Sequence, residues 1–252
     1  MQDRYVGDVG DFGKYALLRY LIGYNKNIPP LNLGVVWCLF PDENHNSDGR
    51  HTSYLQNKTL YKFDRELHDV LRKLVDEDRR KVSAISEVGI FPPDTVFVVD
   101  SIAPTVATTA DRTLQRETWL SRCLYKTINC DIVFFDPDNG IETQSITKRH
   151  PKSGKYIFWD ELRPFAERGQ SMVVYHHTNR TAPVSVQLAQ MGDRLRAEHP
   201  EAEVILPMVF RRGSVRVFWL VLQAGHAELV RSRSQTFLAQ GWTEHFECPT
   251  SF

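Results

Sequence analysis

A chain of 252 residues can form one large α/β domain or two small ones, and it can bury a core without disulfides or metals. Its 31 basic and 31 acidic residues balance, which excludes a strong chain-wide attraction to nucleic acid but leaves room for a local basic groove. No apolar run approaches the roughly 20 residues that cross a bilayer, and the polar start MQDRYVGDVGD is unlike a secretory signal, so we expect a cytoplasmic protein without membrane contact.

The four cysteines form no CxxC pair. Cys38 and Cys130 lie in or beside apolar runs, where cysteine behaves as a small hydrophobic residue. We therefore expect reduced thiols and no zinc site.

Short apolar runs alternate with segments of helical periodicity along the whole chain. A glycine-punctuated loop leads into a helix from about Asp11, within an N-terminal loop–helix extension over 1–30. The predicted strands are 34–40, 94–101, 131–138 and 171–179, followed by a hairpin over 203–223 with an Arg-Arg-Gly-Ser turn. The predicted helices are 60–87, 112–128, a segment from about 160 to 169, 185–199 and 226–242.

This alternation predicts an α/β fold with a mostly parallel sheet, helices on both faces and a terminal antiparallel hairpin, in a single domain over 1–252. Ligands of such sheets bind outside the C-terminal ends of the strands. Polar side chains follow all four predicted strands at that point: Asp42 and Glu43, then Asp100, then Asp136, Asp138 and Asn139, and then His176, His177 and Asn179. We expect them to form one site, the alternative being that loops after strands are simply polar.

The order of elements, the acidic strand end at Asp100 and the sequence DPDN at Asp136–Asn139 resemble the class I S-adenosylmethionine-dependent methyltransferases, a Rossmann-like architecture. The opening GDFGKY at Gly10–Tyr15 is similar, more distantly, to the Gly-Asn loop of the J-type 23S ribosomal RNA adenine-N6 methyltransferases. DPDN occupies the place of their D-P-P-Y motif but lacks its second proline and its aromatic residue. The loop over 41–49 has one glycine, where the family has a glycine-rich loop.

The resemblance implies a methyltransferase that uses S-adenosylmethionine and acts on nucleic acid, RNA among the candidates. Asp136, with Asp138 and Asn139, would orient or deprotonate the methyl acceptor. Asp100 would hold the cofactor ribose, and Asp42 and Gly49 would flank its methionine part. Lys14 and Arg19, on the opening helix, would meet phosphate.

Two further groups of residues suggest a role in catalysis or in nucleic-acid binding, independently of the resemblance. His176 is a candidate general base or base-stacking group, although adjacent strand residues point to opposite faces, so that one histidine of the pair can equally be packed and the other at the rim. Lys148 and Arg149 follow DPDNG in a basic loop that could grip a nucleic-acid backbone, or could be solvated surface charge.

A metal-dependent nuclease or phosphohydrolase is the first alternative function. Asp136, Asp138 and Glu142 are close in sequence, the loop after the first strand adds Asp42 and Asp48, and oxygen-rich clusters suit Mg²⁺ or Mn²⁺. The spacing matches no strong metal motif, so we assign no metal ligand. A non-catalytic binding protein on the same fold is the second alternative.

Overall fold

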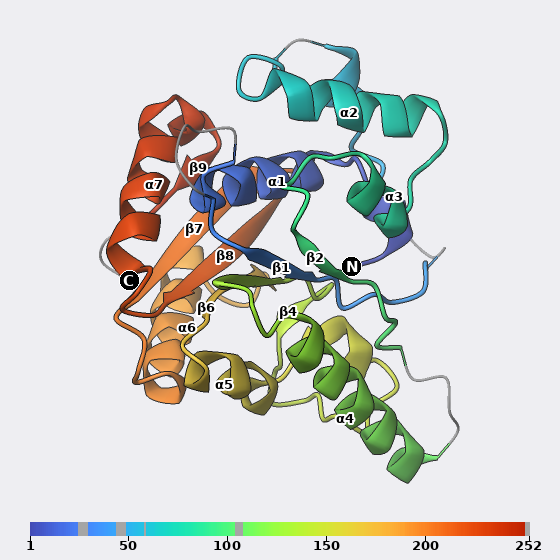
Figure 1. Ribbon diagram of the computed structural model, residues 1–252, viewed down its shortest axis with the longest axis vertical. Coiled ribbons are helices and arrows are strands. Elements are labelled where there is room, and N and C mark those ends of the chain that lie inside the picture. The colour runs from blue at the N-terminus through green and yellow to red at the C-terminus, as the bar shows by residue number, and fades with distance from the viewer. Residues whose placement is uncertain (25–29, 44–48, 58, 104–107, 250–252) are drawn as a thin grey trace.

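In the computed structural model, which describes residues 1–24, 30–43, 49–57, 59–103 and 108–249, a seven-stranded sheet has the order β2-β1-β3-β6-β8-β7-β9 (Figure 1). The first four strands in this order are parallel, and β8, β7 and β9 each run antiparallel to the strand before them. The strands are β1 (Leu33–Val36), β2 (Val96–Val98), β3 (Ile132–Phe135), β6 (Ser171–His177), β7 (Val204–Arg212), β8 (Ser214–Leu222) and β9 (Phe246–Glu247).

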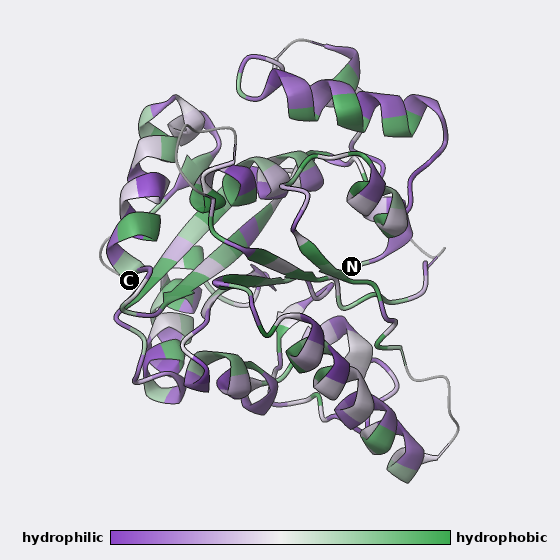
Figure 2. Cartoon of the chain, viewed as in Figure 1, coloured by the Kyte–Doolittle hydropathy of each residue, from purple (hydrophilic) through white to green (hydrophobic). Residues whose placement is uncertain are grey.

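Helices cover both faces of this sheet (Figure 1). One face carries α1 (Val9–Ile22), α2 (Arg65–Asp76), α3 (Val82–Glu87) and α7 (Ala227–Ala239), and the other carries α4 (Thr109–Lys126), α5 (Trp159–Glu167) and α6 (Val184–Glu198). Two hydrophobic cores result, with Phe134 in the first and Phe135 in the second. Because both faces are buried, the central strands are continuous apolar runs, as Figure 2 shows.

The α/β class, the mainly parallel sheet and the antiparallel hairpin agree with the sequence prediction. The sequence did not predict β9 or a separate parallel pair formed by β4 (Gly140–Ile141) and β5 (Tyr156–Ile157). These strands are two residues long, too short for a periodic signal. Within the described part of the N-terminal segment, α1 contributes fully buried side chains such as Phe12 and Tyr15 to the first core.

Strand register decides which side chains meet at the C-terminal edge of the parallel strands. Side chains two positions apart share a face, so Asp136 follows Phe134 toward the face that α1 covers. Tyr175 and His177 follow Val173 to that same face. Because β8 is antiparallel to β6, its first residues lie at the same edge, with Arg216 opposite His177.

Helix α1 is fixed at both of its ends. The Asp8 side chain caps it by accepting a hydrogen bond from the Asp11 N–H at 3.0 Å, and Gly23 ends it in the left-handed conformation. The helix therefore lies across the first core with its N-terminal turns at the edge where β3 ends. This places Lys14 beside Asp136.

Candidate active site

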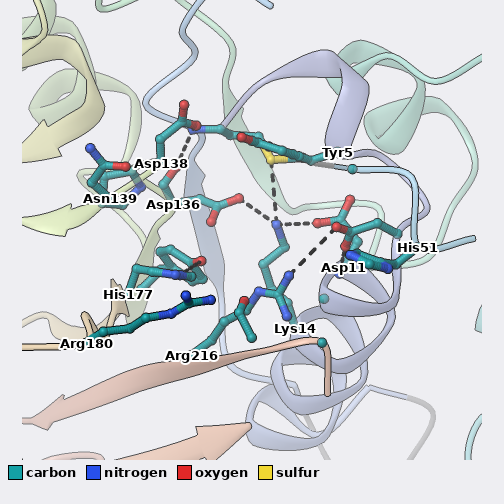
Figure 3. Close-up of a pocket in the computed structure, with 18 residues that line it drawn as sticks. Tyr5, Asp11, Lys14, His51, Asp136, Asp138, Asn139, His177, Arg180 and Arg216 are labelled. Carbon is teal, nitrogen blue, oxygen red and sulfur yellow. Dashed lines mark hydrogen bonds and ion pairs between the residues drawn. The ribbon is translucent and has the colours of Figure 1, made fainter. Parts of the chain in front are cut away.

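A cavity of about 380 Å³ lies at this edge. Helix α1, the segment after β3, the end of β6 and the start of β8 all contribute to it (Figure 3). Its lining consists of Met1, Tyr5, Asp8, Gly10, Asp11, Lys14, Gly49, His51, Asp136, Pro137, Asp138, Asn139, Tyr175, His177, Arg180, Gly213, Ser214 and Arg216. The volume is that of a small-molecule or single-nucleotide site.

At the centre of the cavity, one ammonium group forms ion pairs with two buried carboxylates. Lys14 Nζ lies 2.6 Å from Asp136 Oδ2 and 2.6 Å from Asp11 Oδ1 (Figure 3). All three side chains are 5% exposed or less. Asp11 Oδ2 also accepts hydrogen bonds from the Tyr15 hydroxyl at 3.1 Å and from the Gly7 N–H at 3.2 Å.

The pKa values of all three groups in this cluster are shifted. Burial raises the pKa of Asp136 and of Asp11, and Lys14 lowers both only in part. A neighbouring carboxylate adds to the increase in each case, Asp11 for Asp136 and Asp8 for Asp11. Burial lowers the pKa of Lys14, but the two carboxylates outweigh this and raise it above its ordinary value. Lys14 therefore stays charged, and Asp136 is a stronger base than a solvated aspartate.

Asp138 is held in a different way. Its Oδ1 lies 2.8 Å from the α-amino group of Met1, which also donates to the Asp136 carbonyl oxygen at 2.7 Å. Gln2 Nε2 donates to Asp138 Oδ2 at 2.5 Å, and Lys155 Nζ is 3.8 Å away. Burial would raise the pKa of Asp138, but these donors lower it overall. Asp138 is thus a fixed anion that anchors the N-terminal segment.

Asn139 and Gly140 turn the chain away from β3 into β4. The Asn139 N–H donates to the Lys155 carbonyl at 2.9 Å. Gly140 has φ +103°, and a Cβ there would lie 2.5 Å from His176 Nδ1, so only glycine fits. His176 Nδ1 accepts from the Ile141 N–H at 3.2 Å, and burial lowers the pKa of His176 to about 4.

His176 therefore packs against this turn, and His177 lines the cavity. The division follows strand alternation, with one histidine on each face. A catalytic role for His176 stays a prediction, and its neutral, packed ring is suited to support the turn.

The opposite wall carries a relay of polar side chains. The Tyr175 hydroxyl lies 3.3 Å from His177 Nδ1 and is hydrogen-bonded to Arg216. Arg216 also donates to the Arg212 carbonyl at 2.8 Å and lies 3.8 Å from Asp8. A Cβ on Gly10 would lie 2.7 Å from the guanidinium carbon of Arg216, so this glycine makes room for it.

Of the three residues expected to hold the cofactor, one lines the cavity and two do not. Gly49 lines the cavity. Asp42 is exposed and accepts from the Arg4 N–H at 3.1 Å. Asp100 pairs with Lys126 at 2.7 Å and Arg122 at 3.4 Å on α4, outside the cavity lining. Asp48 lies outside the described residues.

Three of the four residues expected to bind substrate also lie away from the cavity. Arg19 is buried and joins α1 to the α2 region through Asp64 at 3.0 Å and Glu66 at 2.5 Å. Lys148 pairs with Asp160 at 2.5 Å, and Arg149 is exposed beside the start of α4. Lys14 alone of the four lines the cavity.

The sequence did not predict a role for four groups that line this cavity: Asp11, Arg180, Arg216 and the Met1 amino group. Asp11 and Lys14 carry a local signal, since residues three apart on a helix are neighbours. Arg216 becomes a site residue only through its register opposite His177, which no local pattern shows.

Within the described residues, no three His, Cys, Asp or Glu side chains are placed so as to hold a metal ion. All four cysteines are free thiols. None of the described helices combines the length and apolarity needed to span a membrane. Comparisons of the chain with protein-family models, with curated proteins and with solved structures give no match.

Proposed function

We propose that this chain is an S-adenosylmethionine-dependent methyltransferase that acts on nucleic acid. The observation that carries the proposal is the Asp136 carboxylate. It lies just after a central parallel strand, at the wall of a nucleotide-sized cavity, with a raised pKa and a fixed cationic neighbour. A carboxylate of this kind is suited to accept the proton that an amino group loses when it is methylated.

The sheet order supports the same proposal. The parallel strands β2, β1, β3 and β6 are followed by β8, which runs antiparallel between β6 and β7. A parallel sheet closed by an antiparallel hairpin is one of the features by which the sequence resembles class I methyltransferases. In that resemblance, β3 is the strand that ends in the acceptor motif, here Asp136–Asn139.

The cofactor, when bound, supplies a methyl group on a positively charged sulfur. The chain's own part is to orient the acceptor nitrogen and take its proton. Asp136 accepts a hydrogen bond from the acceptor N–H and then the proton itself. Lys14 keeps its charge, and Asp11 holds it in place from the other side.

The residues expected to hold the cofactor fit this proposal only in part. Gly49 lines the cavity, but Asp100 turns toward Lys126 rather than toward it, so the expected ribose contact does not fit. No step above depends on that contact.

The cavity acids also bear on the metal-dependent alternative. Asp11 and Asp136 face Lys14, Asp8 faces Arg216, and Asp138 faces the Met1 amine. A cation bound there would have to displace charges that the chain itself supplies. This arrangement favours proton transfer by Asp136 over metal binding.

The test is transfer of a radiolabelled methyl group from S-adenosylmethionine to bulk cellular RNA, DNA and protein. We expect label on RNA or DNA, and a loss of about 100-fold or more in Asp136→Asn. Asp193→Asn, an equal charge change on the exposed face of α6, should leave the rate unchanged. Lys14 retains Asp11 in the Asp136→Asn variant, so the fold should persist, and its thermal unfolding checks this. Label on protein alone, or full activity of Asp136→Asn, would contradict the proposal.

A further inference from the structure

One wall of the cavity carries positive and hydrogen-bond-donating groups that methyl transfer does not use. Arg180 comes from the loop after β6, His177 from the end of β6, and Arg216 from β8 (Figure 3). Asp136 and Asp138 lie on the other side of the same cavity (Figure 3). The site is therefore polarised, with acids at one side and donors at the other.

Arg180 is a cation of this wall to which the described residues supply no ion-pair partner. Its side chain is exposed, and no acid in the described part of the chain forms an ion pair with it. Lys14 and Arg216, by contrast, each face an aspartate. A guanidinium that lines a cavity without a carboxylate partner is available to an anionic ligand.

The loop that carries Arg180 is held in one conformation. Gln187 on α6 accepts from the Asn179 N–H at 3.0 Å and donates to the carbonyls of Asn179 at 3.0 Å and Ala182 at 2.6 Å. The Asn179 side chain accepts from the Thr181 N–H at 2.9 Å. The backbone on either side of Arg180 is thus fixed, which lowers the entropic cost of placing its side chain on a ligand.

His177 lies beside Tyr175 in this wall. Arg216 can only donate, so the Tyr175 oxygen accepts from it, and the same hydroxyl lies 3.3 Å from His177 Nδ1. Burial raises the pKa of Tyr175, so that its proton stays in place. Whatever its tautomer, the imidazole keeps at least one N–H, which can donate to an anion in the cavity.

We propose that Arg180 and His177, backed by Arg216, bind the phosphate of a nucleotide whose base reaches toward Asp136. Guanidinium and imidazole donors converging from different elements match a tetrahedral oxyanion, and the cavity has room for one nucleotide beside them. The placement of the base at Asp136 rests on the proposed function. The phosphate contact does not, because it depends only on the donors of this wall.

The phosphate could belong to a nucleic acid or to a free nucleotide, and the experiment separates these sources. Fluorescence anisotropy measures binding of a labelled, random-sequence, single-stranded RNA of ten nucleotides, with adenosine 5′-monophosphate as competitor. The variants are Arg180→Ala, Arg180→Lys and, as a matched charge control far from the cavity, Arg231→Ala on α7. Each is measured over a range of salt concentrations.

We expect Arg180→Ala to weaken RNA binding about tenfold and to reduce the salt dependence by about one released ion. Arg180→Lys should recover part of the affinity, and Arg231→Ala should bind as the wild type does. If the monophosphate also binds through Arg180 and displaces RNA at micromolar concentration, the phosphate contact holds and the source is a free nucleotide. Equal binding by the wild type and Arg180→Ala, or no binding of either phosphate ligand by the wild type, would overturn the inference.

Titration with S-adenosylhomocysteine on the same samples keeps this result apart from the proposed function. If the wild type does not bind S-adenosylhomocysteine but binds phosphate ligands through Arg180, the methyltransferase proposal is contradicted and the phosphate site stands. If S-adenosylhomocysteine binds but Arg180→Ala does not weaken RNA binding, the phosphate site is overturned and the methyltransferase proposal stands.

Discussion

The ammonium of Lys14 lies 2.6 Å from the carboxylate of Asp136, 122 positions later in the chain. This contact joins α1 to the end of β3, and it forms because strand alternation turns Asp136 toward the face that α1 covers. The same ammonium is 2.6 Å from Asp11. The stability of the fold and the basicity of Asp136 therefore depend on one cluster.

Removing the Lys14 ammonium should lower the stability of the fold. In Lys14→Met, two buried carboxylates lose their shared cation, and we expect the free energy of unfolding at neutral pH to fall by about 3–5 kcal/mol. Lys62→Met is the control, because the Lys62–Glu244 pair is exposed and should contribute less than about 1 kcal/mol. Urea denaturation measures both. A Lys14→Met cost no larger than that of Lys62→Met would show that the buried cluster does not depend on this cation.

The raised pKa of Asp136 predicts a pH dependence of stability. The folded state takes up the proton at a higher pH than the unfolded chain does, so this group favours the folded state increasingly as pH falls from neutral toward its ordinary pKa of 3.8. Asp136→Asn removes this titrating carboxyl group. The wild type should therefore gain stability relative to Asp136→Asn between pH 7 and pH 4. A difference that stays constant, or that changes in favour of the variant, would contradict the raised pKa.

His176 should remain neutral well below physiological pH. Burial lowers its pKa from 6.5 to about 4, so its side-chain nitrogen resonances should titrate near pH 4, with His176→Gln identifying them by their loss. Protonation of the unfolded chain begins at the higher value, so stability from this group is lost as pH falls from 6.5 toward 4. His176→Phe should reduce that loss by up to about 3 kcal/mol. Titration near 6.5 would show that the ring is solvated rather than packed against Gly140.

Gly140 should be intolerant of a side chain. It has φ +103°, and a Cβ would also lie 2.7 Å from the His176 Cα, so Gly140→Ala adds a backbone clash to conformational strain, costing about 3 kcal/mol or more. Gly169→Ala is the matched control: φ is +74°, and nothing lies within 4 Å of the added Cβ, so strain alone should cost about 1 kcal/mol. Equal costs, measured by thermal unfolding, would show that the turn after Asn139 can move away from His176.

The sheet was predictable because its central strands are buried on both faces and read as unbroken apolar runs, such as Ile132–Phe135. Asp136, Asp138 and Asn139 were predictable as lining residues because they end such a strand. In parallel sheets, that end is where ligands bind.

The partners of these side chains depend on packing between distant segments, which local periodicity does not show. Arg19 was expected to meet phosphate, but the α2 region covers that part of α1 and supplies Asp64 and Glu66. Asp100 was expected to face a cofactor, but α4 places Lys126 beside it. Arg216 enters the site only because a hairpin register aligns it with His177.

We propose that the cavity serves an S-adenosylmethionine-dependent reaction at Asp136. Calorimetric titration of the purified chain with S-adenosylhomocysteine, and separately with Mn²⁺, tests it most directly. We predict micromolar binding of the homocysteine compound without metal, retained in Asp136→Asn because that residue faces the acceptor. Binding of Mn²⁺ alone, lost in Asp138→Asn, would contradict the account and point to metal-dependent phosphodiester chemistry instead. Binding of neither would leave a scaffold without this reaction.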